Sequence, residues 1–289
     1  ANMGPFDVID AHYFYPDGVA AVLLGLWFNK PVVITGRGTD LNLIPKYAAP
    51  RAQIRWAASR AAQIATVSES LRRVLTDLEV PEAKTRTLRN GVDLDAFVPL
   101  GDRKQLRSES GITGPSLLTV GHLIERKGHH LVIKALARLT EVVELRIAGD
   151  GPMEAELRHL ANVEGVAERV HFLGRLDRPD LVKAYNVADS LVLASSREGM
   201  ANVLLESMSC GTPVVATDVW GAPEVVVDES GELVASRDPR ALGEGIQHLL
   251  QRDVSRERVR EHAETFSWEA TTEGQLHMFK SAIKQFSNV

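Results

Sequence analysis

The sequence has little of several features that would place it in a specialised class of protein. Cysteine occurs once among 289 residues, at Cys210. A single cysteine excludes an internal disulfide framework and fits a reducing compartment. The longest apolar run, Val19 to Phe28, is too short to span a bilayer. We therefore expect a cytoplasmic protein, for which peripheral contact with a membrane stays open.

The chain also has no excess of positive charge. The chain has 33 Lys and Arg against 38 Asp and Glu, a net charge of −5, so it has no general attraction for nucleic acid. Any anionic ligand must be held by local dipoles and a few well-placed cations. No His/Cys cluster has zinc spacing, and the phosphate-loop pattern G-x-x-x-x-G-K-[ST] is absent. We expect no metal site.

What the chain does contain is a regular alternation of strands and helices, which predicts parallel sheets with right-handed crossovers. Four strands are expected in the first part, and six, a complete Rossmann-like half, in the second. Their ranges are Asp7–Tyr13, Pro31–Gly36, Gln63–Val67 and Thr85–Leu88, then Ser116–Leu123, Val143–Gly149, Val170–Gly174, Ser190–Ala194, Pro213–Thr217 and Glu232–Val234.

The pattern divides the chain into residues 1–98, residues 99–265 and a C-terminal helix, 266–289. A linker is expected at Phe97–Leu106, where proline and glycine interrupt the alternation. The C-terminal helix is amphipathic, and we expect Trp268, Leu276 and Phe279 to be its packing residues.

The stretch Ser195–Thr217 is the most informative part of the sequence. It predicts a strand end, a loop, a helix over about Asn202–Cys210 and a further strand, with Cys210-Gly211-Thr212-Pro213 ending the helix. The N-terminus of such a helix points to the carboxyl edge of a parallel sheet, where anions bind.

Two carboxylates, Glu198 and Glu206, frame this helix. Acceptor oxygens on both sides of a phosphate-binding turn suit a nucleotide sugar, which has hydroxyls on either side of its diphosphate. The alternative is a pair of solvated surface residues.

Two other turns follow predicted strands. In Gly121–Gly128, Lys127 precedes a helix, where an ammonium and a helix dipole suit phosphate, or where a charge is simply solvated. Gly149-Asp150-Gly151 is expected to be a structural turn. His129 and His130 open the next helix, and we expect them to cap it or to be solvated.

Glu198, seven residues and Glu206, followed by SMSCGTPVVAT, resembles the E-x7-E block of the retaining glycosyltransferases of family 4, which have the GT-B fold. The resemblance implies that Glu198 contacts the donor sugar and Glu206 the ribose. The backbone of Gly199, Met200, Ala201 and Asn202 would then face the diphosphate and sugar. The loop departs from the family's common EGFG, so sugar selectivity does not follow.

Further positions extend the resemblance. GHLIERKG is similar to the family's G-R-L-x-x-x-K-G, which makes Lys127 the diphosphate-binding lysine and puts His122 in place of the arginine. Arg175 and Leu176 would lie beside the base. His12 matches a strand-end histidine near the reacting sugar, and Arg37 and Asp40 would either bind acceptor or order their loop.

The family's N-terminal half begins with further βα units that this sequence does not show. We therefore expect an α/β protein of GT-B type with two Rossmann-like domains, the N-terminal one incomplete. An unpaired sheet edge would then lead to self-association or to covering by another chain.

The implied activity is metal-independent transfer of a hexosyl group, with retention, from a UDP or GDP sugar to a sugar or lipid-linked acceptor. No cofactor beyond this donor is implied. A nucleotide-sugar-binding protein without transfer activity is the alternative, and an epimerase of the same architecture is a third. The D-x-D pattern at Asp93-Leu94-Asp95, a metal motif of another glycosyltransferase fold, is disfavoured by its place in a turn.

Overall fold

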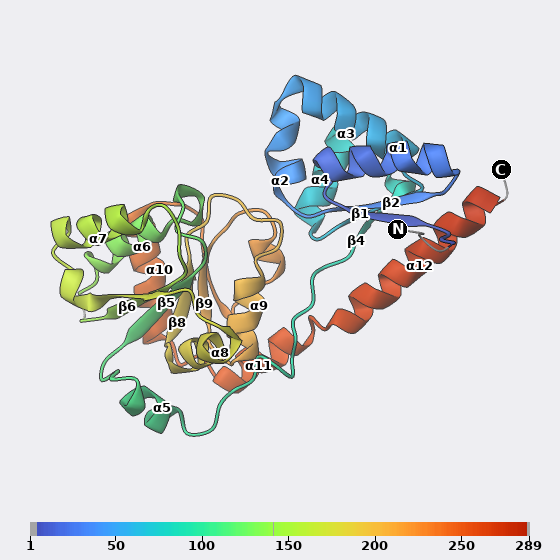
Figure 1. Ribbon diagram of the computed structural model, residues 1–289. Helices are drawn as coiled ribbons and strands as arrows, with labels where there is room; N and C mark the ends of the chain where they lie inside the picture. Colours follow the sequence, from blue (N-terminus) through green and yellow to red (C-terminus); the bar gives the residue numbers. More distant parts are fainter. Residues whose placement is uncertain (1–4, 141, 288–289) are drawn as a thin grey trace. The chain divides into compact units, whose positions relative to one another are not determined.

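The computed structural model describes residues 5–140 and 142–287. It divides into two compact units, coloured along the chain in Figure 1. The first contains the chain up to Gly91, the loop Glu198–Met200 and the segment from Trp268 onward. The second contains Val92–Arg197 and Ala201–Ser267.

The first unit is built on a parallel sheet in the order β1-β2-β3-β4. The number of strands found in its described residues matches the expectation. Its strands are β1 (Ile9–His12), β2 (Val32–Gly36), β3 (Gln63–Thr66) and β4 (Thr85–Thr87). Its helices are α1 (Val19–Phe28), α2 (Thr39–Asn42), α3 (Ala48–Arg60), α4 (Glu69–Asp77) and α12 (Trp268–Ser287).

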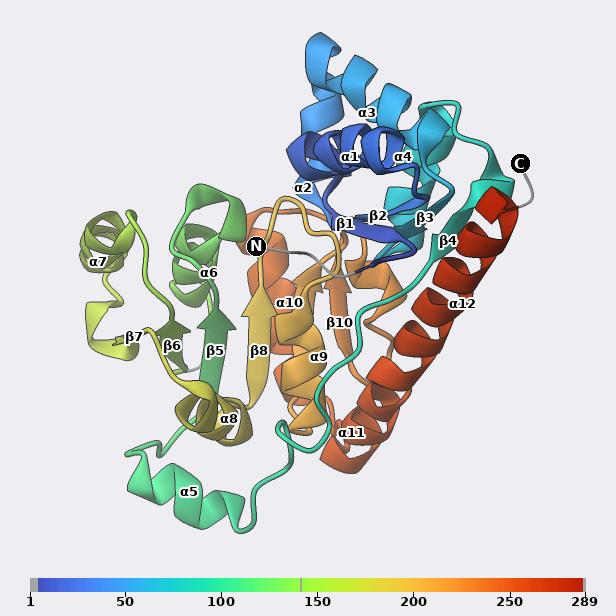
Figure 2. The same ribbon diagram turned by 45° about the vertical axis from the view of Figure 1, so that its right-hand side comes forward.

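Helices cover both faces of this sheet. Successive side chains of β2 point to opposite faces, so each face of the strand contacts a different helix. The Val32 side chain lies against Gly25 of α1. Val33, one residue on, clusters with Met278 and Ala282 of α12. Figures 1 and 2 show α1 and α12 on opposite sides of the strands.

The residues by which α12 packs differ in part from those expected. Phe279 lies against the cluster of Val33 and Met278, but Trp268 and Leu276 are 43% and 49% exposed. The packing stripe follows Gly274, Met278 and Ala282, four residues apart: Met278 and Ala282 are buried, and Gly274 meets the side chain of Leu88. Leu276 falls on the other side of the helix because two residues turn the chain by about 200°.

The second unit has six parallel strands in the order β10-β9-β8-β5-β6-β7. Six were expected. They are β5 (Ser116–Val120), β6 (Glu144–Ala148), β7 (Val170–Gly174), β8 (Ser190–Leu193), β9 (Val214–Thr217) and β10 (Gly231–Val234). The helices are α5 (Arg103–Glu109), α6 (His129–Leu136), α7 (Glu154–Val163), α8 (Arg178–Val187), α9 (Asn202–Ser209), α10 (Pro239–Gln251) and α11 (Arg256–Glu264).

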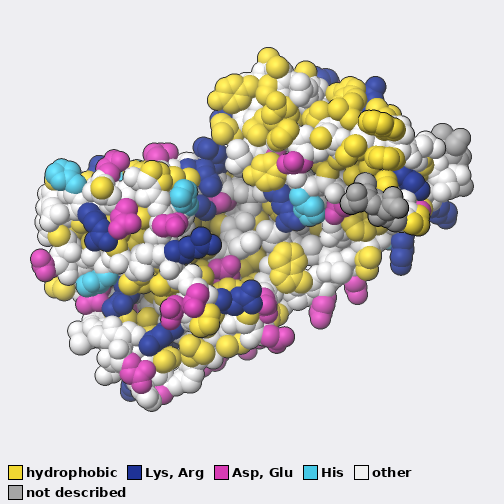
Figure 3. All heavy atoms as spheres, in the orientation of Figure 1, with side chains coloured by type: hydrophobic (Ala, Val, Ile, Leu, Met, Phe, Trp, Pro, Cys, Tyr) yellow, Lys and Arg dark blue, Asp and Glu magenta, His cyan; other side chains and the backbone are white. Residues whose placement is uncertain are grey.

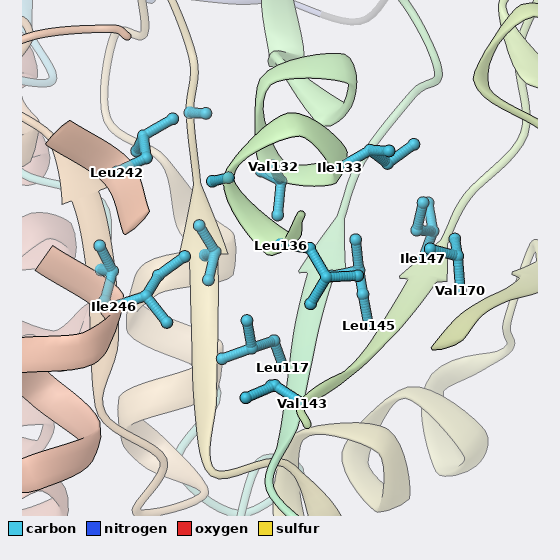
Figure 4. Close-up of a cluster of buried hydrophobic side chains, with 14 of the residues drawn as sticks. Leu117, Val132, Ile133, Leu136, Val143, Leu145, Ile147, Val170, Leu242 and Ile246 are labelled. Carbon is cyan, nitrogen blue, oxygen red and sulfur yellow. The ribbon is translucent and has the colours of Figure 1, made fainter. Parts of the chain in front are cut away.

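One face of the second sheet holds the core drawn in Figure 4, where side chains of α6 and α10 meet those of the strands. Leu157 and Ala161 of α7 belong to the same core. Leu117, Leu136, Leu145 and Ile246 are fully buried in it. At roughly 25 cal/mol per Å² of apolar surface, each such side chain contributes about 1.5–3 kcal/mol. Helices α8, α9 and α11 pack together elsewhere in the unit (Figure 2).

Local sequence signals explain several helix ends. The Asp238 side chain accepts from Arg240 N–H, with Pro239 as the first residue of α10. Gly211 has φ of 74° and ends α9. The expected linker is partly helical, because Asp102 caps α5 and Arg103–Leu106 form its first turn. Among the helices of residues 5–140 and 142–287, none has both the length and the apolar content needed to cross a bilayer.

Candidate functional site

The strand order of the second unit fixes where a ligand can bind. The chain runs from β5 outward to β6 and β7, then returns to β8 on the other side of β5. In open parallel sheets, ligands bind at the carboxyl ends of the strands where the direction of winding reverses. Two loops leave the strands at this point: Gly121–Gly128 after β5, and the segment from Ala194 after β8.

These two loops are fastened to each other. Gly128 has φ of 75°, and a Cβ there would lie 2.0 Å from the carbonyl oxygen of Ala194. The Ser196 N–H donates to the carbonyl of Arg126 at 2.9 Å. Arg237 donates through Nε to the Ala194 carbonyl and through Nη2 to that of Glu125, at 2.9 and 2.7 Å. The loop after β5 is therefore a fixed platform.

Lys127 closes the short 3-10 helix Glu125–Lys127 on this platform. A Cβ on Gly121 would lie 3.5 Å from Lys127 Cδ, so the lysine stem passes over the end of β5. Any larger residue at position 121 would also be strained, because its φ is 150°. The structure thus places an ammonium side chain beside the end of β5, where the direction of winding reverses.

His122 lies on the same loop and is exposed. Its Nδ1 is 2.7 Å from the carbonyl oxygen of Asp150. Because a carbonyl only accepts, Nδ1 carries the proton in this contact and Nε2 is the ring's remaining acceptor.

Helix α9 begins where the loop after β8 ends. Its N-cap, Ala201, has no side-chain oxygen with which to cap the first turn, and the first turn contains no acidic residue. The partial positive charge of this helix end is therefore not offset by its own residues, which favours an anion there. Ala201 is buried and Asn202 is exposed.

Glu206 lies one turn further along α9 and is partly buried. The hydroxyl of the fully buried Tyr185 donates to its Oε2 at 2.8 Å. Burial raises the pKa of Glu206, although the Tyr185 hydrogen bond opposes this. Burial, and then the adjacent carboxylate, raises the pKa of Tyr185 well above its usual value. Tyr185 is therefore a donor at any working pH and fixes one carboxylate oxygen.

Arg175 and Leu176 follow β7, which lies at the outer edge of the sheet, two strands from β5. Arg175 is exposed and Leu176 is partly exposed. Gly174 before them has φ of 65° and accepts the Gly149 N–H at 2.8 Å. Gly149 and Gly151 form the expected structural turn, since a Cβ on either would overlap the backbone of the loop after β5.

The remaining candidates belong to the first unit. The Glu198 carbonyl accepts from Asn42 Nδ2 at 3.3 Å, and the Met200 sulfur lies 3.2 Å from the Asn90 N–H. A Cβ on Gly199 would lie 1.8 Å from the Arg37 carbonyl oxygen, so only glycine fits there. Glu198 itself is 8% exposed.

His12 stands at the carboxyl end of β1, held by polar neighbours. Arg37 Nε donates to its Nδ1 at 3.0 Å, which leaves Nε2 to carry the proton. That nitrogen lies 3.1 Å from Asp10 Oδ2, which also accepts from Gln275 at 3.0 Å. Burial lowers the pKa of Arg37, and the nearby carboxylates of Asp10 and Asp40 oppose that shift. The histidine tautomer is therefore set by its surroundings.

Asp40 is an ordering residue. It is fully buried and accepts the N–H groups of Phe14, Arg37 and Gly38 at 2.9, 3.1 and 2.7 Å. Its pKa is nevertheless raised, because burial outweighs these hydrogen bonds. Of the two roles open from the sequence, ordering the loop is the one these contacts support.

His129 was expected to cap or be solvated, and that expectation is wrong. The ring is 2% exposed, and its Nδ1 is 3.1 Å from the Thr119 hydroxyl. Burial lowers its pKa to about 4, so it is neutral near pH 7. Asp93, in the D-x-D pattern, accepts the Ala96 N–H at 3.0 Å and so stabilises a turn.

The structure thus assigns the candidates to both units. His12 and Glu198–Met200 belong to the first, and His122, Lys127, Arg175, Leu176, Ala201, Asn202 and Glu206 to the second. Sequence reasoning missed Tyr185 and Arg237, which have no motif of their own. Only the hydrogen-bonding need of a buried phenol gives a general signal for Tyr185.

Comparison with known proteins agrees with this architecture. The chain matches Glycosyl transferases group 1 over residues 102–266 and Glycosyltransferase Family 4 over residues 2–96. It is 30% identical over 310 residues to a D-inositol 3-phosphate glycosyltransferase of Mycobacterium marinum, covering 98% of this chain and 65% of that protein. The Mycobacterium tuberculosis protein of that name is 33% identical over 240 residues, covering 78% and 49%.

Two solved structures share the fold. HepE from Anabaena, in complex with UDP, superposes with a TM-score of 0.87 at 20% identity, covering 96% of this chain and 79% of that one. Sucrose-phosphate synthase from Thermosynechococcus elongatus gives 0.79 at 25% identity, covering 94% and 73%. The chain spans about two thirds of the length of the curated relatives it matches most fully. The parallel sheets, the GT-B neighbours and the family match together confirm the predicted resemblance: the chain belongs to the glycosyl transferases group 1 family.

Proposed function

We propose that the second unit binds a nucleoside diphosphate sugar and that the chain transfers the hexosyl group to an acceptor with retention of configuration. The observation that carries the proposal is that the Lys127 loop is hydrogen-bonded to the loop after β8, and that this loop leads into α9, whose first turn has neither a side-chain cap nor an acidic residue. An ammonium and a helix dipole together stabilise a diphosphate, both bound and as a leaving group.

Glu206 is proposed to accept hydrogen bonds from the ribose hydroxyls. Tyr185 occupies one of its oxygens, which orients the carboxylate and leaves the other oxygen for the ligand. Uridine is the base we favour, because the HepE structures contain UDP and UDP-glucose. Arg175 and Leu176 are proposed to lie beside that base, and His122 beside the diphosphate.

In the proposed reaction the bond from the anomeric carbon to the diphosphate oxygen breaks, and the acceptor oxygen bonds to that carbon on the same face. The acceptor proton passes to the departing diphosphate, so the protein supplies electrostatic stabilisation and positioning. Glu198 and the backbone of Gly199, Met200, Ala201 and Asn202 would position the donor sugar. His12, with its tautomer set by Arg37, would lie on the acceptor side, taking a sugar or lipid-linked acceptor.

Calorimetry with UDP, GDP and ADP tests the binding step. Glu206→Ala should weaken binding of the preferred nucleotide by about 1–3 kcal/mol, because it leaves ribose hydroxyls unpaired. Glu156→Ala is the matched control, since Glu156 is an exposed glutamate on α7 of the same unit. Equal affinity in both variants would contradict the assignment of Glu206.

Release of UDP from UDP-glucose, with and without acceptor sugars, tests the transfer step. Release that depends on an acceptor supports a transferase. Binding without release favours a nucleotide-sugar-binding protein, an alternative kept open by the share of the relatives' length that the chain spans. A changed sugar without an acceptor would favour an epimerase.

A further inference from the structure

A cavity of about 520 Å³ lies in the second unit, at the edge of the sheet opposite the candidate site. Pro115, Asp189 and Pro213 line it, and each comes directly before a strand, β5, β8 and β9 in turn. The cavity is therefore at the amino ends of these strands, which are the tails of the arrows in Figure 2, towards α5 and α11. The Lys127 loop follows the carboxyl end of β5. A ligand in the cavity would bind apart from the proposed donor site.

Positive charge dominates the lining of this cavity. Its charged residues are four arginines and two aspartates, an excess of two positive charges, although the whole chain is at −5. Two of the arginines belong to α5, one follows α10, and one begins α11. Figure 3 shows how Lys, Arg, Asp and Glu are intermixed over the surface that it presents. A local excess of one sign favours a ligand of the opposite sign. The charged lining residues are Arg103, Arg107, Arg252, Arg256, Asp189 and Asp253.

Carboxylates compensate only part of this charge. Arg103 Nη2 donates to Asp189 Oδ1 at 2.6 Å, and Arg107 Nη1 donates to Asp189 Oδ2 at 2.9 Å, so two arginines share one carboxylate. Arg252 forms an ion pair with Glu232 at 3.2 Å and is thereby balanced. Within residues 5–140 and 142–287, Arg256 has no carboxylate at ion-pair distance. The uncompensated charge therefore lies on Arg103, Arg107 and Arg256, which we name the arginine cluster.

The carboxyl end of α8 explains why these arginines are assembled, but not why there are three. Arg103 and Arg256 donate to the carbonyl of Ala188 at 3.1 and 3.2 Å, and Arg107 donates to that of Val187 at 2.7 Å. The end of a helix is equivalent to about half of a negative charge, which one cation more than balances. Capping of α8 therefore leaves most of the positive charge of the arginine cluster unbalanced.

The arginines also repel one another. Burial, and then the charge of Arg103, lowers the pKa of Arg256 to about 10. Within the described part of the chain, Arg103 Nη1 and Arg107 Nε donate no hydrogen bond, although the two side chains are only 32% and 15% exposed. These N–H groups can donate to a ligand in the cavity that both residues line. A bound anion would supply acceptors and reduce the repulsion.

We propose that this cavity binds the phosphate group of a small organic phosphate, held by the arginine cluster. A phosphate monoester carries a charge of about −1.5 to −2 near pH 7, which matches the excess of positive charge in the lining. Guanidinium groups bind phosphate oxygens through paired N–H donors. The volume falls in the range of roughly 300–1,000 Å³ of small-molecule sites, so it leaves room for the organic part of the ligand. The inference is independent of the proposed transferase activity.

Calorimetry of the full chain with inorganic phosphate and with glycerol 3-phosphate tests the proposal, with an excess of UDP present to occupy the proposed donor site. We expect both probes to bind, more weakly as salt is added, and glycerol not to bind. Arg103→Gln should raise the Kd for phosphate about tenfold, because it removes a charged donor. Arg103→Lys keeps the charge but not the paired donors, so its Kd should lie between those of Arg103→Gln and the wild type. Arg103 is partly exposed, so near-UV circular dichroism should be unchanged in both variants.

Arg240→Gln is the matched control, because Arg240 is an exposed arginine on α10 of the same unit and pairs with Glu244 of its own helix. Its Kd for phosphate should equal that of the wild type. Lys127→Gln should also leave this Kd unchanged, which distinguishes the cavity from the proposed donor site. Absence of phosphate binding would overturn the proposal, as would binding that Arg103→Gln leaves unchanged. Binding that is lost in Lys127→Gln but kept in Arg103→Gln would overturn it in favour of the donor site.

Discussion

Replacing Glu206 by glutamine should affect the stability of the fold and the affinity for nucleotide in opposite directions. Glutamine keeps the size of the side chain and still offers Tyr185 an amide oxygen to donate to, but it removes the negative charge. The wild-type carboxylate is partly buried, and burial raises its pKa. At neutral pH the folded protein therefore keeps a charge that the unfolded chain accommodates more easily.

The sign of the stability effect follows from that shift. The pKa of Glu206 is higher in the folded protein than in the unfolded chain. Its favourable contribution to the free energy of unfolding is therefore complete at pH values below the pKa of the unfolded chain. That contribution is lost as the pH rises through the pKa of Glu206 in the folded protein. We expect Glu206→Gln to be at least as stable as wild type at about pH 7.5, with a smaller gain towards about pH 4.5. Thermal unfolding at both pH values measures the difference.

The binding effect should go in the opposite direction. A hydrogen bond to a charged group contributes about 1.5–3 kcal/mol, and a neutral one about 0.5–1.5 kcal/mol. Loss of the charge at a ribose hydroxyl should therefore cost roughly 1–2 kcal/mol, about 5- to 30-fold in the Kd for UDP. Calorimetry on Glu206→Gln, with Glu156→Gln as control, measures this. An unchanged Kd would refute the ribose assignment, and a large loss of stability would refute the account of burial.

Tyr185→Phe should lower the free energy of unfolding by about 1–3 kcal/mol, because it leaves a Glu206 oxygen without its donor, and it should also raise the Kd for UDP. Chemical denaturation measures the first effect and calorimetry the second. Unchanged values would contradict the orienting role of Tyr185. Gly128→Ala should destabilise the second unit by several kcal/mol, because φ is 75° at this position and the added Cβ would lie 2.0 Å from the carbonyl oxygen of Ala194. A melting temperature equal to that of the wild type would contradict this. His12→Gln should reduce transfer but leave UDP affinity unchanged, and a matching fall in affinity would place His12 elsewhere in the mechanism.

The order of elements was largely predictable from the sequence. The succession of strand-like and helix-like stretches marked the elements of both units, and β8 and β9 were apolar runs without alternation. Ser68, Asp238 and Gly211 marked helix ends through their own side chains or backbone. These signals act within a few residues, so the sequence displays them directly.

Contacts between distant residues were not predictable. Tyr185 reaches Glu206 from a neighbouring helix, and nothing near position 185 announces that contact. The packing face of α12 was partly mistaken, because Leu276 and Met278 are equally apolar and only the position of β2 decides which is buried.

The sequence by itself determined the strand and helix alternation, the helix ends and the spacing of Glu198, Lys127 and Glu206, because each depends on local conformation or on chain order. The tertiary structure decided which strand ends are neighbours, and so brought the Lys127 loop against the end of β8. It also decided that His129 is buried and that Trp27 is exposed. The physical reason is that burial and electrostatics depend on distance in space, and that distance is set only when the strands have paired and the helices have packed.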